Sequence, residues 1–286
     1  MDEWAGFNAG LRRSGNMESG TTENILMRTV VSLGKSGLNL ANYILELSAL
    51  FLKSVLSFFR LHPYTRKVIW SNTAKQILFT GVDGLFVIST VSALLGMVII
   101  IQAYTLLPGL GSDLIASLLV LVIVRELGPL LTAFIIIGRS GTAVATEIGN
   151  MKVSHEIDAL HSMGIDPIRF IVAPRLLGMI ISMSLLGIYF DVVGILGGYV
   201  VAQLQISLPF DSFLQSMLQA IRIEDIYIGL VKNAFFGIAI SMVCCYQGMQ
   251  VRISITEVPQ RTTKAVVGSI FFCFLFNAIF TVAFYI

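Results

Sequence analysis

The residues of this chain that could do chemistry are a few charged side chains inside long apolar runs. Arg125 and Glu126 are neighbours in one run, and Asp191 and Lys232 lie inside two others. A charge at the centre of a bilayer costs about 2.5–3.5 kcal/mol on insertion scales, so such groups usually face a cavity or a charged partner. Arg125 and Glu126 could therefore contact a polar ligand in a cavity or form an ion pair that braces helices. Both interpretations remain open.

The residues that follow this pair predict a local weakness in the helix. Gly128 and Pro129 come directly after Leu127, and proline removes one backbone hydrogen bond from a helix. Adjacent side chains on a helix point about 100° apart, so Arg125 and Glu126 can face one ligand only where the helix is broken.

The sequence offers several partners for the other two buried charges. Lys232 and Asp191 could pair with each other, pair with Arg125 and Glu126, or line a water-filled path. For Asp191 we favour a hydrogen bond between helices.

The composition excludes most soluble classes of protein. Of the 286 residues, 56% are hydrophobic and only 13% are charged, whereas soluble domains carry about 25% charged residues. This excludes an ordinary cytosolic enzyme, a disordered chain and a secreted disulfide scaffold. Cys244, Cys245 and Cys273 lie in apolar runs without metal-type spacing, so we expect buried thiols, no metal site and no disulfide framework. The chain is predicted to be an integral membrane protein.

Five apolar runs are long enough to cross a bilayer, which requires about 20 residues. They cover residues 84–107, 114–138, 176–202, 226–251 and 265–286. No run has the period of two that a strand would show, so helices must satisfy the backbone hydrogen bonds. We therefore predict an all-α membrane protein with five transmembrane helices.

The distribution of lysine and arginine sets the expected orientation. Sixteen of these residues precede the first span or lie in the segments between spans two and three and between spans four and five. The opposite side has only Arg222. Because basic residues collect on the cytoplasmic side, the N-terminus is expected in the cytoplasm and the C-terminus outside.

Three regions are expected along the chain. Residues 1–23 are polar and are expected to be flexible. Residues 24–80 include a narrow polar stripe on an apolar helix, which favours a helix lying in the membrane interface, although a sixth span is the alternative. Residues 81–286 form the five-helix domain.

The segment between spans two and three contains two patterns. Small residues recur at 138, 141, 145 and 149, a spacing that allows close approach of another helix. A short amphipathic helix is predicted from Ser154, as its N-cap, to Met163. Such a helix suits docking to a partner protein, and the alternative is a connector packed on its own chain. Its two histidines do not make a metal site without further ligands.

No motif indicates catalysis or nucleotide binding. The chain has no Walker A sequence, no nucleophile elbow, no dinucleotide-binding fingerprint and no basic, aromatic nucleic-acid surface. Energy for any transport must therefore come from elsewhere. An ion-coupled transporter using Arg125, Glu126, Asp191 and Lys232 is one alternative, although inverted halves are not visible. The hypothesis of a lipid-modifying enzyme is weaker. Such an enzyme should have a cluster of His with Asp or Ser near one interface, and the only histidines are His62, His155 and His161, on or near cytoplasmic segments.

Several separated blocks resemble the signature of the MlaE (YrbE) permease family. They include RELGPLLTA at 125–133, GRSG at 138–141, EIGNM at 147–151, IDAL at 157–160 and RTTKAVV at 261–267. The resemblance covers about residues 30–286.

This resemblance implies the permease subunit of an ABC transporter, without catalysis or a cofactor of its own. It implies a homodimer in the inner membrane, with an interfacial elbow helix and five membrane helices per subunit. The expected partners are a cytoplasmic ATPase, a periplasmic MCE-domain protein and usually a STAS-domain protein. The expected cargo is glycerophospholipid, moved between inner and outer membranes or between plastid envelope membranes.

The resemblance also assigns residues to two roles. Positions facing the lipid cavity are matched by Tyr104, Arg125, Glu126, Leu127 and Lys232. The element that couples to the ATPase is matched by the short helix, and the residues expected to serve coupling are Arg139, Glu147, His155, Glu156 and Asp158.

The chain departs from the family pattern in the short helix. Family members commonly read Glu-Gln before Ile-Asp-Ala-Leu, whereas this chain has His155 and Glu156 there. Moving the carboxylate by one position rotates it about 100° around the helix. The ion pair to an ATPase is therefore expected to differ, and a pH-sensitive histidine contact becomes available.

Overall fold

The computed structural model describes residues 38, 41–56, 63–106, 112–206, 209–252 and 254–285. The chain divides into two units, Met1–Ala49 and Leu50–Ile286. Residues 41–56 are helical, as expected for the amphipathic segment, and their position relative to a membrane stays a prediction. The segment 1–23 lies outside the described residues.

Helices joined by short turns make up the rest of the described chain, and no described residue lies in a strand. The first group is α2 Pro63–Gly81, the 3₁₀ turn η1 Val82–Gly84 and α3 Leu85–Leu106, followed by α4 Ser112–Leu119, η2 Val120–Leu127, α5 Gly128–Ile136, η3 Ile137–Gly141 and α6 Thr142–Val153. The second group is α7 Glu156–Ser162, η4 Ile168–Val172, α8 Ala173–Ile206, α9 Phe210–Ala220, α10 Ile223–Met249 and α11 Glu257–Tyr285. The all-α class is confirmed.

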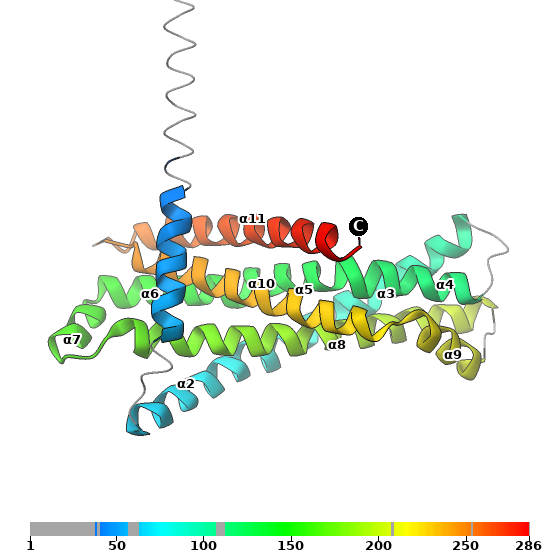
Figure 1. Ribbon diagram of the computed structural model, residues 1–286, viewed down its shortest axis with the longest axis horizontal. Coiled ribbons are helices and arrows are strands. Elements are labelled where there is room, and N and C mark those ends of the chain that lie inside the picture. Colours follow the sequence, from blue (N-terminus) through cyan, green and yellow to red (C-terminus); the bar gives the residue numbers. More distant parts are fainter. Residues whose placement is uncertain are drawn as a thin grey trace, which may run out of the picture. The chain divides into compact units, whose positions relative to one another are not determined.

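Five helical stretches are long and apolar enough to cross a membrane, as predicted. They are Ile69–Thr105, Ser117–Val153, Ile168–Leu204, Ile223–Met249 and Glu257–Phe284. Within Leu50–Ile286, α6 and α7 lie at one end of the helices, and α4 and α9 lie at the other (Figure 1). We call these the α7 end and the α9 end.

The second stretch is longer than predicted, and this changes where its charges lie. It continues through residues 138–153, which the sequence indicated as a connecting segment, because α10 and α11 pack against α6 and cover it. Arg125 and Glu126 were expected at the midpoint of the span. They lie instead in its first third, nearer the α9 end.

Three short π-helical segments interrupt the second and third stretches: η2, η3 and η4. The first includes Arg125 and Glu126 and ends immediately before Gly128-Pro129. There the Gly128 N–H donates to the Ile123 carbonyl, five residues back. The predicted break is therefore present as a π-helix. This geometry is rare in proteins as a whole, and where it occurs it is often at a functional site.

Small residues set the spacing of the helices. α8 packs against α2, α3 and α10. A Cβ on Gly197 of α8 would lie 2.6 Å from the Cα of Ala93 in α3, so the two backbones nearly touch. Such close contact is typical of membrane helices joined through small residues.

The predicted row of small residues is confirmed in part. A Cβ on Gly141 would lie 3.2 Å from Cys244 Sγ, and one on Gly149 would lie 3.2 Å from side-chain atoms of Val251 and Val258. A Cβ on Gly138 would meet no atom of the described residues within 4 Å, so this glycine does not bring two helices together. Cys244, Cys245 and Cys273 are buried, as expected.

Candidate functional site

A buried ion pair joins the second and fourth spans. Arg125 Nε lies 2.9 Å from Asp225 Oδ1, and Arg125 Nη2 donates to Asp225 Oδ2 at 3.0 Å. The Asp225 side chain is only 3% exposed, whereas that of Arg125 is 23% exposed. Asp225 Oδ2 also accepts from the backbone N–H of Arg222 and so caps the start of α10. One carboxylate therefore fixes both the arginine and the helix end.

Lys232 provides a second link between the same two spans. Its Nζ donates to the backbone carbonyl of Arg125 at 2.8 Å and lies 3.5 Å from Glu126 Oε2. The side chain is 1% exposed. A buried lysine costs free energy unless it is paired, and both contacts come from η2.

Pro129 accounts for the carbonyl that Lys232 binds. In a regular α-helix the N–H of residue 129 would donate to the carbonyl of Arg125, but proline has no N–H. The Lys232 ammonium takes this role. A backbone defect in the second span is thus matched by a cation in the fourth.

Glu126 extends the network to the fifth span. Asn277 Nδ2 donates to Glu126 Oε2 at 3.1 Å, and Thr281 Oγ1 donates to Glu126 Oε1 at 2.9 Å. Arg125 and Glu126, adjacent in η2, thus contact different sets of partners on other helices. We call Arg125, Glu126, Asp225, Lys232, Asn277 and Thr281 the charged network.

Three members of the network were not predicted as site residues. Asp225 lies near the start of a helix, where an acidic residue usually serves as a cap. Asn277 and Thr281 lie one helical turn apart in an otherwise apolar span. Two polar residues four positions apart lie on the same face of a helix, so this pair could have indicated that a polar group of another helix lies opposite.

Asp191 does not join the charged network. Its Oδ1 is buried without a hydrogen-bond partner among the described residues, so the hydrogen bond between helices that we favoured is not found for that atom. The carboxylate instead packs on Gly128, where an added Cβ would lie 2.5 Å from Asp191 Oδ1. Pairing of Asp191 with Lys232 is likewise not observed.

The other two residues expected to face lipid are partly exposed. Leu127 is the last residue of η2, and Tyr104 lies in the last turn of α3. Neither has a polar contact in the charged network. Their role in lipid contact stays a prediction.

The connection between α6 and α7 contains a strained residue. His155 has φ 58°, the left-handed region, and is the N-cap of α7. The predicted N-cap, Ser154, is instead the C-cap of α6. This prediction was wrong because α6 runs on to Val153, so the chain must turn at residues 154 and 155 before a new helix can begin.

Charged residues around α7 pair locally. Lys152 Nζ donates to Asp158 Oδ1 at 2.9 Å, and His155 Nδ1 lies 3.1 Å from Asp158 Oδ2. The hydrogen bond from Lys152, followed by that from His155, lowers the pKa of Asp158. Ile157 is buried, whereas Glu156 is exposed. α7 is thus anchored by one apolar side chain and presents its acidic side outward.

The remaining residues expected to serve coupling contact their own chain. Arg139 lies 3.2 Å from Asp83, donates to the Phe79 carbonyl and stacks over the Phe79 ring. Glu147 Oε1 lies 2.9 Å from Arg175 Nη2. These contacts join α6 and η3 to the first and third spans.

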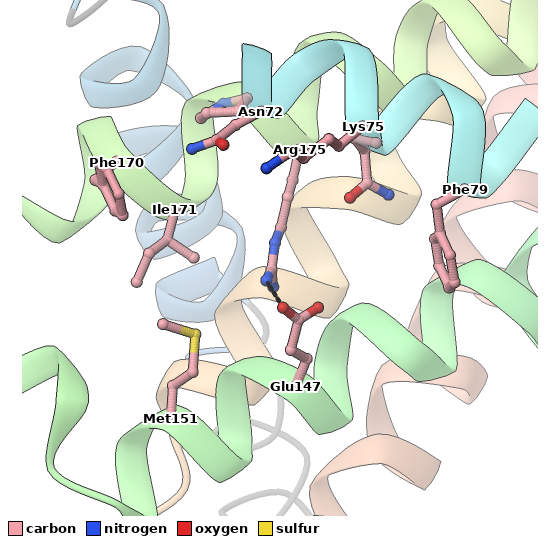
Figure 2. Close-up of a pocket in the computed structure, with 10 residues that line it drawn as sticks. Asn72, Lys75, Phe79, Glu147, Met151, Phe170, Ile171 and Arg175 are labelled. Atoms are coloured by element: carbon pink, nitrogen blue, oxygen red, sulfur yellow. Dashed lines mark ion pairs between the residues drawn. The ribbon is translucent and has the colours of Figure 1, made fainter. Parts of the chain in front are cut away.

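A cavity of about 320 Å³ surrounds the Glu147–Arg175 pair. Figure 2 shows this pair near the middle of the lining side chains, with Phe79 to one side and Phe170 to the other. The lining comes from α2, α6, η4 and α8. It lies at the α7 end, whereas the charged network lies nearer the α9 end.

The fold and these sites define a multi-pass α-helical membrane protein with charges held between its spans. The model of the family described as Permease MlaE matches residues 73–283. The chain belongs to this permease family.

Relatives of known name agree with this. The chain is 33% identical to a probable ABC transporter permease protein of Rickettsia bellii, over 91% of this chain and 99% of the relative. It is 33% identical to the intermembrane phospholipid transport system permease protein MlaE of Haemophilus influenzae, over 68% of this chain and 75% of the relative. It is 31% identical to the chloroplastic protein TRIGALACTOSYLDIACYLGLYCEROL 1 of Arabidopsis thaliana, over 71% and 59%.

Proposed function

We propose that this chain is the permease subunit of an ABC transporter that moves glycerophospholipids between two membranes. Family membership supports the class, and the name of the Haemophilus relative supports the cargo. The observation within the chain that carries the proposal is the charged network. It places a partly exposed arginine and glutamate inside a membrane span, where they can meet a phosphate and an amine.

The exposed fractions of the side chains in the charged network indicate which residues hold position and which are available to a lipid. Lys232 and Asp225 are almost fully buried, whereas Arg125 and Glu126 keep 23% and 30% of their side-chain surface exposed. The buried pair fixes the exposed pair in position. Arg125 and Glu126 then offer a lipid headgroup a preorganised cation and anion, and the apolar surfaces of the spans accommodate the acyl chains. In this proposal Tyr104 and Leu127 border the same cavity.

The α7 end is the proposed attachment point of a separate ATPase. α7 presents Glu156 and Asp158 to solvent, and its anchor Ile157 transmits force to the spans. His155 belongs to this surface. Arg139 and Glu147, which pair with other spans, pass the movement on. This orientation places the α7 end in the cytoplasm and the C-terminus on the opposite side of the inner membrane.

The proposed assembly has further members. Two copies of the chain form a homodimer with the lipid cavity between them, an MCE-domain protein receives or delivers lipid in the periplasm, and a STAS-domain protein accompanies the ATPase. The part of the segment 24–80 that precedes the first membrane stretch, which begins at Ile69, lies along the membrane interface as an elbow.

The first experiment purifies the tagged full-length chain gently from its native host and identifies co-eluting proteins and lipids by mass spectrometry. We expect an ATPase, an MCE-domain protein and phospholipid. The isolated complex in proteoliposomes then transfers a fluorescent phospholipid when ATP is added, and Glu126→Ala reduces that transfer.

An ion-coupled transporter would behave differently. A protonophore added at constant ATP leaves transfer intact under our proposal, whereas an ion-coupled transporter loses it. Loss of transfer on uncoupling, or a chain that elutes alone even after crosslinking at Glu156, would overturn the ABC assignment.

A further inference from the structure

The cavity at the α7 end is built by three different membrane spans. Lys75 and Phe79 come from α2, Glu147 from α6, and Phe170 and Arg175 from η4 and α8. The first and third spans begin near these residues and the second ends near them, at Ile69, Ile168 and Val153. These stretches have 37 residues each, about 55 Å of helix against a hydrocarbon core of about 30 Å. We therefore expect residues about two turns inside their ends, such as those that line the cavity, to lie at the depth of lipid headgroups.

The polar lining of the cavity carries an excess of positive charge. Arg175 is only 9% exposed and is held at two points, by Glu147 at 2.9 Å and by the Val144 carbonyl at 3.3 Å. Lys75 is exposed, and no carboxylate of the described residues forms an ion pair with it. Two cations face one carboxylate, so an added anion would complete the charge balance.

Apolar side chains border the same cavity. Phe79 and Phe170 are 40% and 37% exposed, and they lie on opposite sides of the Glu147–Arg175 pair (Figure 2). Rigid aromatic groups beside a fixed cation suit a ligand with an anionic head and an apolar body. A soluble anion would gain nothing from these two rings.

We propose that this cavity binds the headgroup phosphate of an anionic phospholipid from the leaflet at the α7 end, at a site separate from the charged network. The Lys75 ammonium and the free donors of the Arg175 guanidinium meet the phosphate, and Phe79 and Phe170 contact the glycerol and the first acyl carbons. The bound lipid ties α2 to α6 and α8. This site needs no transport activity, so its failure would leave the proposed function untouched.

The test measures lipid binding to the purified full chain in neutral detergent by native mass spectrometry, with phosphatidylglycerol as the probe. Lys75→Gln lowers the affinity for phosphatidylglycerol about five-fold, the effect expected for one surface cation near an anionic lipid. Lys67→Gln is the matched control, because Lys67 is exposed on the same helix but does not line the cavity. It leaves the affinity unchanged.

A second variant should change the affinity for phosphatidylglycerol in the opposite direction. Glu147→Gln removes the competing carboxylate from Arg175 and raises the affinity for phosphatidylglycerol several-fold, while Lys75→Arg retains wild-type binding. Equal losses in Lys75→Gln and Lys67→Gln would show only general surface attraction and would overturn the site. Equally tight binding of phosphatidylcholine, or full competition by millimolar glycerol phosphate, would also overturn it, since the first excludes anion selectivity and the second excludes a lipid ligand.

Discussion

The two ends of the helical unit use charge in opposite ways. Near the α9 end, Lys232 and Asp225 are 1% and 3% exposed and are paired with residues of another span. At the α7 end, the side chains of His155 and Asp158 are 71% and 52% exposed, although the two are paired with each other. Similar pairs thus lie in very different surroundings.

The surroundings decide what each pair does. Removing one member of a buried pair costs about 3–5 kcal/mol, because it leaves a charge without compensation, whereas an exposed pair contributes about 0–1 kcal/mol. The charged network therefore holds the spans together and fixes Arg125 and Glu126, which we propose meet a lipid headgroup. The exposed pairs at the α7 end can exchange partners at little cost, which suits a surface that docks and releases.

The largest effect is expected from Lys232→Met. It removes the hydrogen-bond donor from the Arg125 carbonyl and leaves Glu126 without its cation. We therefore expect the free energy of unfolding to fall by about 3 kcal/mol. Thermal unfolding in detergent, followed by size-exclusion chromatography, measures the change. Adding Glu126→Gln removes the unpaired charge and recovers part of the loss. If the Lys232→Met protein is as stable as wild type, the buried pairs near the α9 end contribute no more to stability than the exposed pairs at the α7 end, and the comparison fails.

The next effect is expected from Asp225→Asn. This substitution keeps the shape of the side chain but removes the charge that holds Arg125 at two points. Because Arg125 is partly exposed, we expect a loss of about 2 kcal/mol, the value of a hydrogen bond to a charged group. Asp211→Asn is the control, because Asp211 is exposed in the first turn of α9. It should change stability by less than about 0.5 kcal/mol. Equal melting temperatures for the two variants would contradict the bracing role of Asp225.

A smaller loss is expected from Gly128→Ala. The new methyl group would lie 2.5 Å from both Asp191 Oδ1 and the Ile123 carbonyl, and such overpacking costs about 1–2 kcal/mol. Gly229→Ala is the matched control in α10, because nothing lies within 4 Å of its added methyl. It should be neutral or stabilising by up to about 1 kcal/mol, since alanine favours helix. A stabilised Gly128→Ala would show that η2 is looser than its geometry indicates.

The smallest effect is expected from the pH response of α7. Because the hydrogen bond from Lys152 lowers the pKa of Asp158 below 3.8, the ionised Asp158 supports α7 at all pH values above about 3.8. That support disappears as pH falls through the lowered pKa. Lys152→Gln should raise the pKa of Asp158, as measured by NMR titration of labelled aspartate. Lys264→Gln, an exposed change on α11, should leave it unchanged.

The spans could be predicted from the sequence because burial in lipid demands long apolar helices, and each predicted run coincides with a helical stretch of the structure over most of its length. The run 226–251, for example, extends beyond its helix, which ends at Met249. The ends of those helices were harder to predict. Residues 138–153 are polar enough to suggest a connecting segment, yet they remain helical because α10 and α11 cover them. The second span is thus extended by tertiary packing, which cannot be predicted from the length of an apolar run.

The site was predictable only in part, for a similar reason. Arg125, Glu126 and Lys232 are conspicuous because a charge inside an apolar run is costly wherever it lies. Asp225 lies at a helix start, where a carboxylate is unremarkable until its partner is known. The left-handed His155 was also missed, because non-glycine residues rarely adopt this conformation and its sequence neighbours give no warning.

The π-helical segments of the second span have a consequence for its rotational register. Each wider turn rotates all later side chains relative to an unbroken α-helix. Two such turns precede Glu147 in this span: η2, which contains Arg125, and η3. A helical wheel drawn through the whole span therefore assigns Glu147 to the wrong face. The two ends of this span are thus phased by the local winding of the backbone between them, and grafting either end onto a straight helix would misalign the other.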